Sequence, residues 1–244
     1  MNNTINKYLE IKTTVSKEKL TEQIKSLEPW SHKVVFSNGV STENGEKRTP
    51  FNEFPLRKLI KVYSHIPLKE LRGGTLLDIG SNIGFNSIYA SQNFGLKCTG
   101  IDVVKKHIEK AKILSELANV KCNFIQASAE NFVQNDFFDV ILHLGTLYHL
   151  PNPILSLSLS YQNLKKGGWL ALETQTFDNE QLDPKLCYFI QGFNNDKTNF
   201  WALSTPVLIE ILEHLNFTQI KEISRVHHNK VHLHMYRVLF VCRK

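Results

Sequence analysis

This chain of 244 residues lacks several features that mark special classes of protein. Its four cysteines, at positions 98, 122, 187 and 242, form no C-x-x-C pair, which excludes the usual zinc-ribbon and dithiol motifs. No apolar run approaches the roughly 20 residues of a membrane span. The polar start MNNTINKYLEIK has no apolar segment of the kind found in secretory signals. We therefore expect a cytoplasmic protein with reduced thiols and no membrane partner.

Long runs of one charge are missing as well. The net charge is nevertheless +6, and the short clusters KKHIEKAK and LKKGG are basic. This balance favours an anionic partner, either nucleic acid or a phosphorylated metabolite, although scattered charges of this kind also occur in proteins with no charged partner.

The apolar pattern from residue 75 onward alternates between two periods. Short apolar runs predict strands at 75–80, 96–103, 120–128, 138–145 and 167–175, and amphipathic segments predict helices at 82–93, 105–118 and 152–164. Strands that alternate with helices form parallel βαβ units. We therefore expect an α/β fold with a doubly wound, mostly parallel sheet.

The two flanks of this region carry other patterns. Residues 16–28 and 53–70 predict amphipathic helices, and residues 34–40 predict a short strand that meets a turn. After a helix at 205–215, residues 232–243 are strand-like and predict an antiparallel edge of the sheet. We expect one domain over residues 1–244, with an N-terminal helical cap or lid at 1–70 and the ligand-binding core with its insertions at 71–244.

The segment LLDIGSNIGFNS at residues 76–87 is typical of a nucleotide-binding loop, but it lacks the dinucleotide fingerprint. Gly80 and Gly84 flank Asn82, so G-x-G-x-x-G does not fit, and a nicotinamide dehydrogenase is disfavoured. Gly80 would let the backbone approach a ligand, and asparagine is among the few residues that tolerate the left-handed backbone expected at position 82. The alternative is a plain strand-to-helix turn.

Three further segments follow the next predicted strands, where ligands bind in open α/β sheets. Asp102 ends the second strand and could accept hydrogen bonds from ribose hydroxyls. Ala129 and Glu130, in QASAENF, follow the third strand and suit an adenine edge. LHLGTLYHLPNP, which contains Gly145, follows the fourth strand. Each segment alone is a weak signal, and the ordered set is a strong one.

The ordered set resembles the class I S-adenosylmethionine-dependent methyltransferases over roughly residues 70–175. The resemblance implies the Rossmann-like methyltransferase fold and S-adenosyl-L-methionine as the cofactor, which has no pyrophosphate. It further implies that Asp78, Gly80, Asn82 and Gly84 line the methionine part, that Asp102 binds the ribose, and that Ala129, Glu130 and Gly145 complete the cofactor site.

A closer resemblance covers PWSHKVVFSNGV, LGTLYHLPNP, LALETQ, TNFWALST and YRVLFVCRK, which are similar to the tRNA wobble-uridine carboxymethyltransferase family. Members of that family use a carboxylated S-adenosylmethionine and hold its extra carboxylate with a lysine, a tyrosine and an arginine. The resemblance implies these roles for Tyr148 and Arg237. His32 stands at the lysine position with Lys33 beside it, and the choice between plain and carboxylated cofactor stays open.

Several residues are candidates for the chemistry of transfer. Tyr148 and His149 follow the fourth strand and are both catalytic candidates. His149 is the first candidate for a general base, and the alternative is a helix-start histidine bonded to backbone. Glu173, placed at the end of the fifth strand, could orient a substrate hydroxyl and needs a partner if it is buried. His143, inside the fourth strand, is expected in the core.

Other candidates lie late in the chain. Asn199 and Trp201 precede the last predicted helix. They either contribute to packing or, as the resemblance implies, line the substrate site. Arg237 lies in an apolar strand, where a bound anion or a neighbouring carboxylate would compensate its charge. The histidine-rich stretch at 227–234 has no evident complete ligand set, so we expect no metal.

These observations lead to ranked hypotheses about function. The first is a methyltransferase that O-methylates a small, polar, anionic metabolite, phosphorylated or nucleotide-linked, such as a precursor of a surface polysaccharide. The second is a tRNA wobble-uridine methyl- or carboxymethyltransferase, for which tRNA would be the partner. A binding module without catalysis is a third, and the intact loop and Asp102 argue against it.

Overall fold

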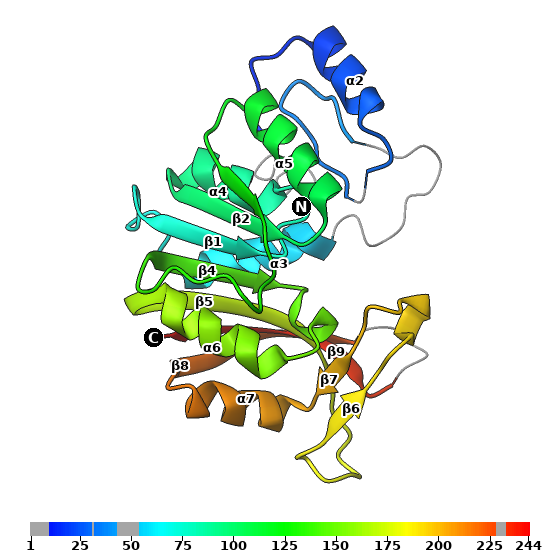
Figure 1. Cartoon of the computed structure of the whole chain (residues 1–244), viewed down its shortest axis with the longest axis vertical. Coiled ribbons are helices and arrows are strands. Elements are labelled where there is room, and N and C mark those ends of the chain that lie inside the picture. The colour runs from blue at the N-terminus through cyan, green and yellow to red at the C-terminus, as the bar shows by residue number, and fades with distance from the viewer. Residues whose placement is uncertain (1–9, 31, 43–53, 228–232) are drawn as a thin grey trace. The chain divides into compact units, whose positions relative to one another are not determined.

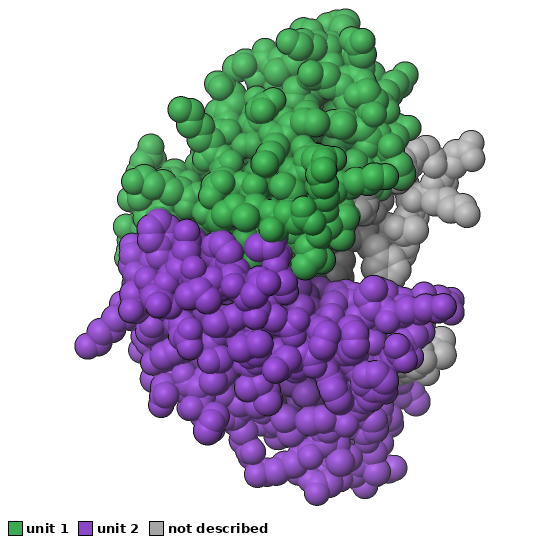
Figure 2. All heavy atoms as spheres, in the orientation of Figure 1, with its two compact units in different colours: residues 1–126 green, residues 127–244 purple. Residues whose placement is uncertain are grey.

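The computed structural model describes residues 10–30, 32–42, 54–227 and 233–244. The chain divides into two compact units, residues 1–126 and residues 127–244 (Figure 2). The single domain with a cap at residues 1–70 remains a prediction. Among the described residues, no helix is both long enough and apolar enough to cross a membrane.

The first unit contains three parallel strands with helices between them (Figure 1). The strands lie in the order β3, β2, β1, and Asp78 pairs in register with Gly100. The elements are α2 (Lys17–Ser26), α3 (Phe54–His65), β1 (Thr75–Ile79), α4 (Phe85–Phe94), β2 (Lys97–Asp102), α5 (Lys105–Leu117) and β3 (Asn123–Gln126). The predicted βαβ units are therefore present in this unit.

The segment before β1 differs in two places from its prediction, and the first is helix α3, which ends at His65 instead of near residue 70 because Pro67 follows. Helix α2 begins as expected after Ser16, whose hydroxyl accepts a hydrogen bond from the amide of Lys19. The strand expected at residues 34–40 does not form, and two isolated bridges, Ile11 to Phe36 and Val35 to Ser41, take its place. The prediction was wrong because the turn at Asn38-Gly39 returns the chain after too few residues for a ladder.

The second unit holds the remaining strands. Its elements are β4 (Phe138–Leu144), η2 (Leu147–His149), α6 (Pro153–Asn163), β5 (Leu164–Phe177), β6 (Cys187–Phe189), η3 (Phe193–Asn195), β7 (Trp201–Leu203), α7 (Thr205–His214), β8 (Thr218–His227) and β9 (Met235–Arg243). The long strand β5 pairs in parallel with β4 and antiparallel with β9, and β9 pairs on its other side with β8. The antiparallel C-terminal strands expected from the sequence are confirmed.

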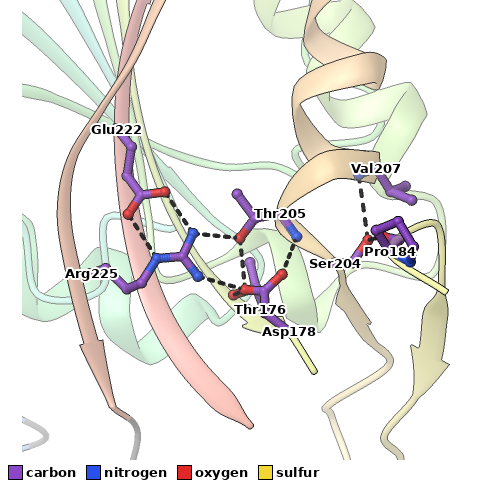
Figure 3. A network of polar contacts seen from close by, with 8 residues as sticks. All are labelled: Thr176, Asp178, Pro184, Ser204, Thr205, Val207, Glu222 and Arg225. Atoms are coloured by element: carbon purple, nitrogen blue, oxygen red, sulfur yellow. Dashed lines mark hydrogen bonds and ion pairs between the residues drawn. The ribbon is translucent and has the colours of Figure 1, made fainter. Parts of the chain in front are cut away.

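A polar network fixes the end of β5 to α7 and β8 (Figure 3). The Asp178 carboxylate accepts hydrogen bonds from the amide and hydroxyl of Thr205, both at 2.7 Å, and from Nη1 of Arg225 at 2.8 Å. Thr205 is the first residue of α7, where unpaired amides favour an acid. Arg225 also forms two hydrogen bonds with Glu222, so the network joins three elements that are far apart in sequence.

Candidate active site

The loop after β1 has the backbone that its sequence predicts. Gly80, Asn82 and Gly84 all have positive φ, at 69°, 48° and 79°. At Gly84 a Cβ atom would lie 2.5 Å from Cζ of Phe124, so a larger residue would displace that ring. Helix α4 starts at the next residue, Phe85. Because Gly84 has no side chain, the start of this helix can pack closely against Phe124.

Asp102, at the end of β2, is held in place by the same loop. One carboxylate oxygen accepts the amide of Asn82 at 2.9 Å, and the other accepts the amide of Val104 at 2.8 Å and faces Nδ1 of His107 at 3.2 Å. A carboxylate has about four acceptor positions. One therefore remains on the oxygen that faces Asn82, where it can accept a hydrogen bond from a ligand.

Asp78 is buried near the end of β1, at 1% exposure. Its oxygens accept hydrogen bonds from the Ser87 hydroxyl at 3.0 Å and from the Asn86 amide at 3.4 Å. Burial raises the pKa of Asp78 to about 7, although the two hydrogen bonds oppose the rise. A positively charged ligand would favour its ionised form, so Asp78 suits the cationic cofactor that the resemblance implies.

His32 lies against this loop, although it is 50 residues away in the sequence. Its side chain is hydrogen-bonded to Asn82. Burial lowers the pKa of His32, and the nearby charges of Lys58 and His107 lower it further, while the bond to Asn82 acts in the opposite direction. The position that carries lysine in the carboxymethyltransferase family therefore holds a neutral imidazole here at neutral pH. Lys33 is half-buried beside it.

In the second unit, Glu173 and Arg237 form a two-pronged ion pair. Nε of Arg237 lies 2.5 Å from Oε1 of Glu173, and Nη2 lies 2.7 Å from Oε2. The side chain of Arg237 is 11% exposed and that of Glu173 is 2% exposed. Glu173 lies inside β5, which runs on to Phe177, so the prediction that it ends the strand was wrong. The strand continues because its last residues pair with β9.

Tyr148 completes this pair from the loop after β4. The guanidinium of Arg237 lies 4.6 Å from the centre of the Tyr148 ring, within range of a cation–π interaction. Burial lowers the pKa of Arg237, but the charge of Glu173 and the side-chain hydrogen bonds with Glu173 and Tyr148 outweigh burial, so the net shift is upward. The sequence left either an anion or a carboxylate neighbour to compensate Arg237, and the structure supplies the carboxylate.

His149 is the second residue of this loop with a defined hydrogen-bond role. Its Nδ1 lies 3.2 Å from the Thr198 carbonyl oxygen and 3.0 Å from the Thr198 hydroxyl. That hydroxyl donates its single hydrogen to Asp196 at 2.6 Å, so both Thr198 oxygens can only accept from His149. Nδ1 therefore carries the proton, and Nε2 presents a lone pair.

The charge of His149 follows from its surroundings. Burial lowers the pKa of His149, and the charge of Arg237 lowers it further, whereas the bond to Thr198 and the charge of Asp196 act in the opposite direction. The net shift is downward, so the imidazole is neutral at neutral pH. A neutral imidazole with Nε2 unprotonated has the form that a general base requires.

The remaining candidates also lie in the second unit. Glu130 accepts a hydrogen bond from the amide of Asn152 at 2.7 Å, and Ala129 beside it is buried. Gly145 has φ 79° and donates its amide to the Glu173 carbonyl at 2.9 Å. These contacts fix the loops after β3 and β4.

The segment before α7 combines packing with an aromatic surface. Asn199 is buried and donates to the Phe193 carbonyl at 2.8 Å, and Trp201 donates to the Pro151 carbonyl at 3.0 Å. Phe189, which is 58% exposed, lies 5.3 Å from the Trp201 ring. These rings belong to strands β6 and β7, which were not predicted because each is only three residues long.

Within the described part of the chain, no group of three or more His, Cys, Asp or Glu side chains comes together as a metal site would require. Residues 228–232 of the histidine-rich stretch lie outside the described residues.

Comparison with known proteins identifies the family. The model of the methyltransferase domain family matches residues 51–228, and the chain belongs to this family. The chain therefore carries a methyltransferase domain.

Curated relatives resemble the chain over most of its length. The tRNA U34 carboxymethyltransferase of Haemophilus influenzae (strain PittGG) is 28% identical over 210 residues, which are 84% of this chain and 61% of that protein. The protein of the same name from Actinobacillus pleuropneumoniae serotype 3 (strain JL03) is 26% identical over 208 residues, 84% of this chain and 61% of its own. The chain thus spans about 61% of the length of these relatives.

Solved structures share the fold. The N-terminal domain of EvdMO1 with SAH bound has a TM-score of 0.71 at 17% identity, covering 94% of this chain and 97% of that one. Phosphoethanolamine N-methyltransferase 2 of Haemonchus contortus, in complex with S-adenosyl-L-methionine, has a TM-score of 0.64 at 16% identity, covering 77% of this chain and 52% of that one. The expected methyltransferase fold is confirmed.

Proposed function

We propose that this methyltransferase O-methylates a small, polar, anionic metabolite that carries a hydroxyl group. The observation that carries the proposal is the fixed tautomer of His149, because a hydroxyl acceptor gains from a base whereas many other acceptors do not. The net charge of +6 supports an anionic substrate, such as a phosphorylated or nucleotide-linked metabolite.

Binding of the cofactor is assigned to the first unit. Asp102 would bind a ribose hydroxyl, and the loop of Gly80, Asn82 and Gly84 would accommodate the methionine part. Asp78 would be ionised beside the positive charge of the cofactor. In the second unit, Ala129, Glu130 and Gly145 are assigned to the cofactor by the family resemblance. S-adenosylmethionine supplies an activated methyl group on a sulfonium sulfur.

The acceptor chemistry is assigned to the second unit. Nε2 of His149 would take the proton of the acceptor hydroxyl, which makes its oxygen a better nucleophile toward the methyl group that the cofactor would supply. Thr198 and Asp196 keep the imidazole in the tautomer that this step needs. Tyr148, Asn199 and Trp201 are assigned to the substrate side, where alignment of the acceptor contributes much of the acceleration.

Arg237 stands at the position of the arginine that binds the cofactor carboxylate in the carboxymethyltransferase family, but in this proposal it binds Glu173 instead. Nε and Nη2 of Arg237 each donate a hydrogen bond to Glu173, so a carboxylate of the protein already compensates the charge of Arg237. His32, at the lysine position, is neutral at neutral pH. Both observations support plain S-adenosylmethionine rather than its carboxylated form.

A second candidate function is modification of the tRNA wobble uridine. It is favoured by the curated relatives, which carry the name tRNA U34 carboxymethyltransferase at 26–28% identity. In that case Lys33 would supply the charge that His32 lacks, and tRNA would bind with strong dependence on salt.

Calorimetric titration separates the two functions. The full chain is titrated with S-adenosylmethionine, with its carboxylated form and with bulk tRNA, at 50 and 200 mM salt. We expect the plain cofactor to bind more tightly and tRNA to show no specific binding. Tighter binding of the carboxylated cofactor, together with tRNA affinity that falls steeply with salt, would instead establish the wobble-uridine function.

A further inference from the structure

Cys98 and Cys122 are brought together by the pairing of β2 with β3. Thr99 pairs with Asn123 in this parallel ladder, and each cysteine is the residue just before one of them. Neighbouring strands lie about 4.8 Å apart, which is within the range of about 4.4–6.8 Å between Cα atoms that a disulfide needs. The two thiols are hydrogen-bonded to each other.

The two thiols differ in exposure. Cys98 is 4% exposed, whereas Cys122 is only partly buried, so a dissolved oxidant meets Cys122 first. All four cysteines of the chain are free thiols in this structure. Cys187 is the exposed one and Cys242 is buried.

The surroundings of Cys122 favour its thiolate. The hydrogen bond from Cys98 lowers the pKa of Cys122, burial opposes this, and hydroxyl groups of Ser115 and Ser91 lower it again. The same hydrogen bond raises the pKa of Cys98, as does burial. Cys122 is therefore the nucleophile of the pair.

We propose that Cys98 and Cys122 form a dithiol site that reacts with hydroperoxides and closes to an intramolecular disulfide. The Cys122 thiolate attacks one peroxide oxygen, the O–O bond breaks, and a sulfenic acid and water form. The Cys98 sulfur then attacks the Cys122 sulfur and displaces a second water as the S–S bond forms. Two thiols are oxidised by two electrons and one hydrogen peroxide is reduced to two waters, so the balance is complete.

The test uses the full chain, reduced and then treated with one equivalent of hydrogen peroxide. Free thiols are counted under denaturing conditions, and the peptides are mapped without reduction. Trypsin cleaves after Lys97 and Lys121, which releases peptides that begin at the two cysteines. We expect the count to fall from four thiols to two, with a linked pair of these peptides that dithiothreitol separates.

Three variants distinguish the roles of the thiols. In Cys98→Ser the sulfenic acid should persist on Cys122, where dimedone labels it, and Cys122→Ser should form no disulfide. Cys187→Ser is the matched control and should form the disulfide as the natural chain does. Oxidation confined to Cys187, or a disulfide between two chains, would overturn the proposal. Since the natural chain gives the first readout, a variant that fails to fold does not weaken the test.

Discussion

Arg237 and Glu173 lie diagonally across the antiparallel pair of β5 and β9 and share two hydrogen bonds of 2.5 and 2.7 Å. The residues are 64 positions apart in the sequence, and each alone would be a costly buried charge. The pair explains how an arginine is tolerated in the apolar strand β9. It also places a fixed ion pair under the ring of Tyr148.

Removing one member of this pair should destabilise the protein strongly. Glu173→Gln and Arg237→Met should each lower the free energy of unfolding by about 3–5 kcal/mol, because the remaining charge stays buried without its partner. Urea unfolding measures the loss. Asp139→Asn is the control, since its pair with Lys165 is partly exposed and should be worth less than about 1 kcal/mol. Similar small losses in all three variants would contradict the buried pair.

The sequence predicts the local parts of this molecule well. The glycine loop and Asp102 are found because each follows a short apolar strand, and strand ends are defined by local periodicity. Strands β6 and β7 are missed because three residues carry no period. Strand β8 is missed because most of its residues are exposed, so it has no clear apolar alternation.

For residues far apart in the sequence, we could predict that a partner is required but not which residue provides it. Burial cost indicates that Glu173 and Arg237 each require a partner, but the pairing of β5 with β9 decides that they satisfy one another. The tautomer of His149 depends in the same way on Thr198, 49 residues later. The cysteine pair has no sequence signal, because its members are 24 positions apart and only the parallel pairing of β2 with β3 brings them together.

Loss of the Asp102 carboxylate should weaken cofactor binding. Asp102→Ala removes a hydrogen bond of a charged group to the ribose and releases the amide of Asn82, at a cost of roughly 1.5–3 kcal/mol, or about 10- to 150-fold in Kd. Calorimetry with S-adenosylmethionine measures the change. Glu109→Ala, on the exposed side of α5, is the control and should bind as the natural chain does. Unchanged affinity in a folded Asp102→Ala protein would refute the cofactor assignment.

His143 should make the fold sensitive to acid. It is fully buried, Nε2 lies 2.9 Å from the Ser156 hydroxyl, and burial lowers its pKa from 6.5 to about 4. Because the folded state favours the neutral ring, its contribution is complete above pH 6.5 and is lost as pH falls towards 4. The loss at pH 4 is about 3 kcal/mol.

Urea unfolding at pH 7 and pH 4 tests this expectation. The natural chain should lose about 3 kcal/mol more between the two conditions than His143→Gln, whose amide does not titrate. The other acid-sensitive groups are common to both proteins and cancel in the difference. An equal loss in the two proteins would show that His143 does not carry the acid sensitivity.

His149 should control the acid limb of the methyl-transfer rate. His149→Ala should lower kcat by about 100- to 10,000-fold, the usual contribution of a general base, while the Kd of the cofactor stays the same. Because the pKa of His149 is lowered, the rate of the natural chain should hold as pH falls through 6.5 and drop only below it. Exposed His214→Ala is the control and should leave the rate and its pH profile unchanged.

Thr198→Val tests how the imidazole is positioned. The change removes the hydroxyl that accepts from Nδ1 and donates to Asp196, while the carbonyl acceptor remains. We expect a lower kcat and a shifted acid limb, with the KM of the cofactor unchanged, because only the orientation and proton affinity of His149 are altered. An unaltered rate in His149→Ala would show that His149 is not the general base. If the rate of Thr198→Val falls without any change of the pH profile, Thr198 has only a structural role.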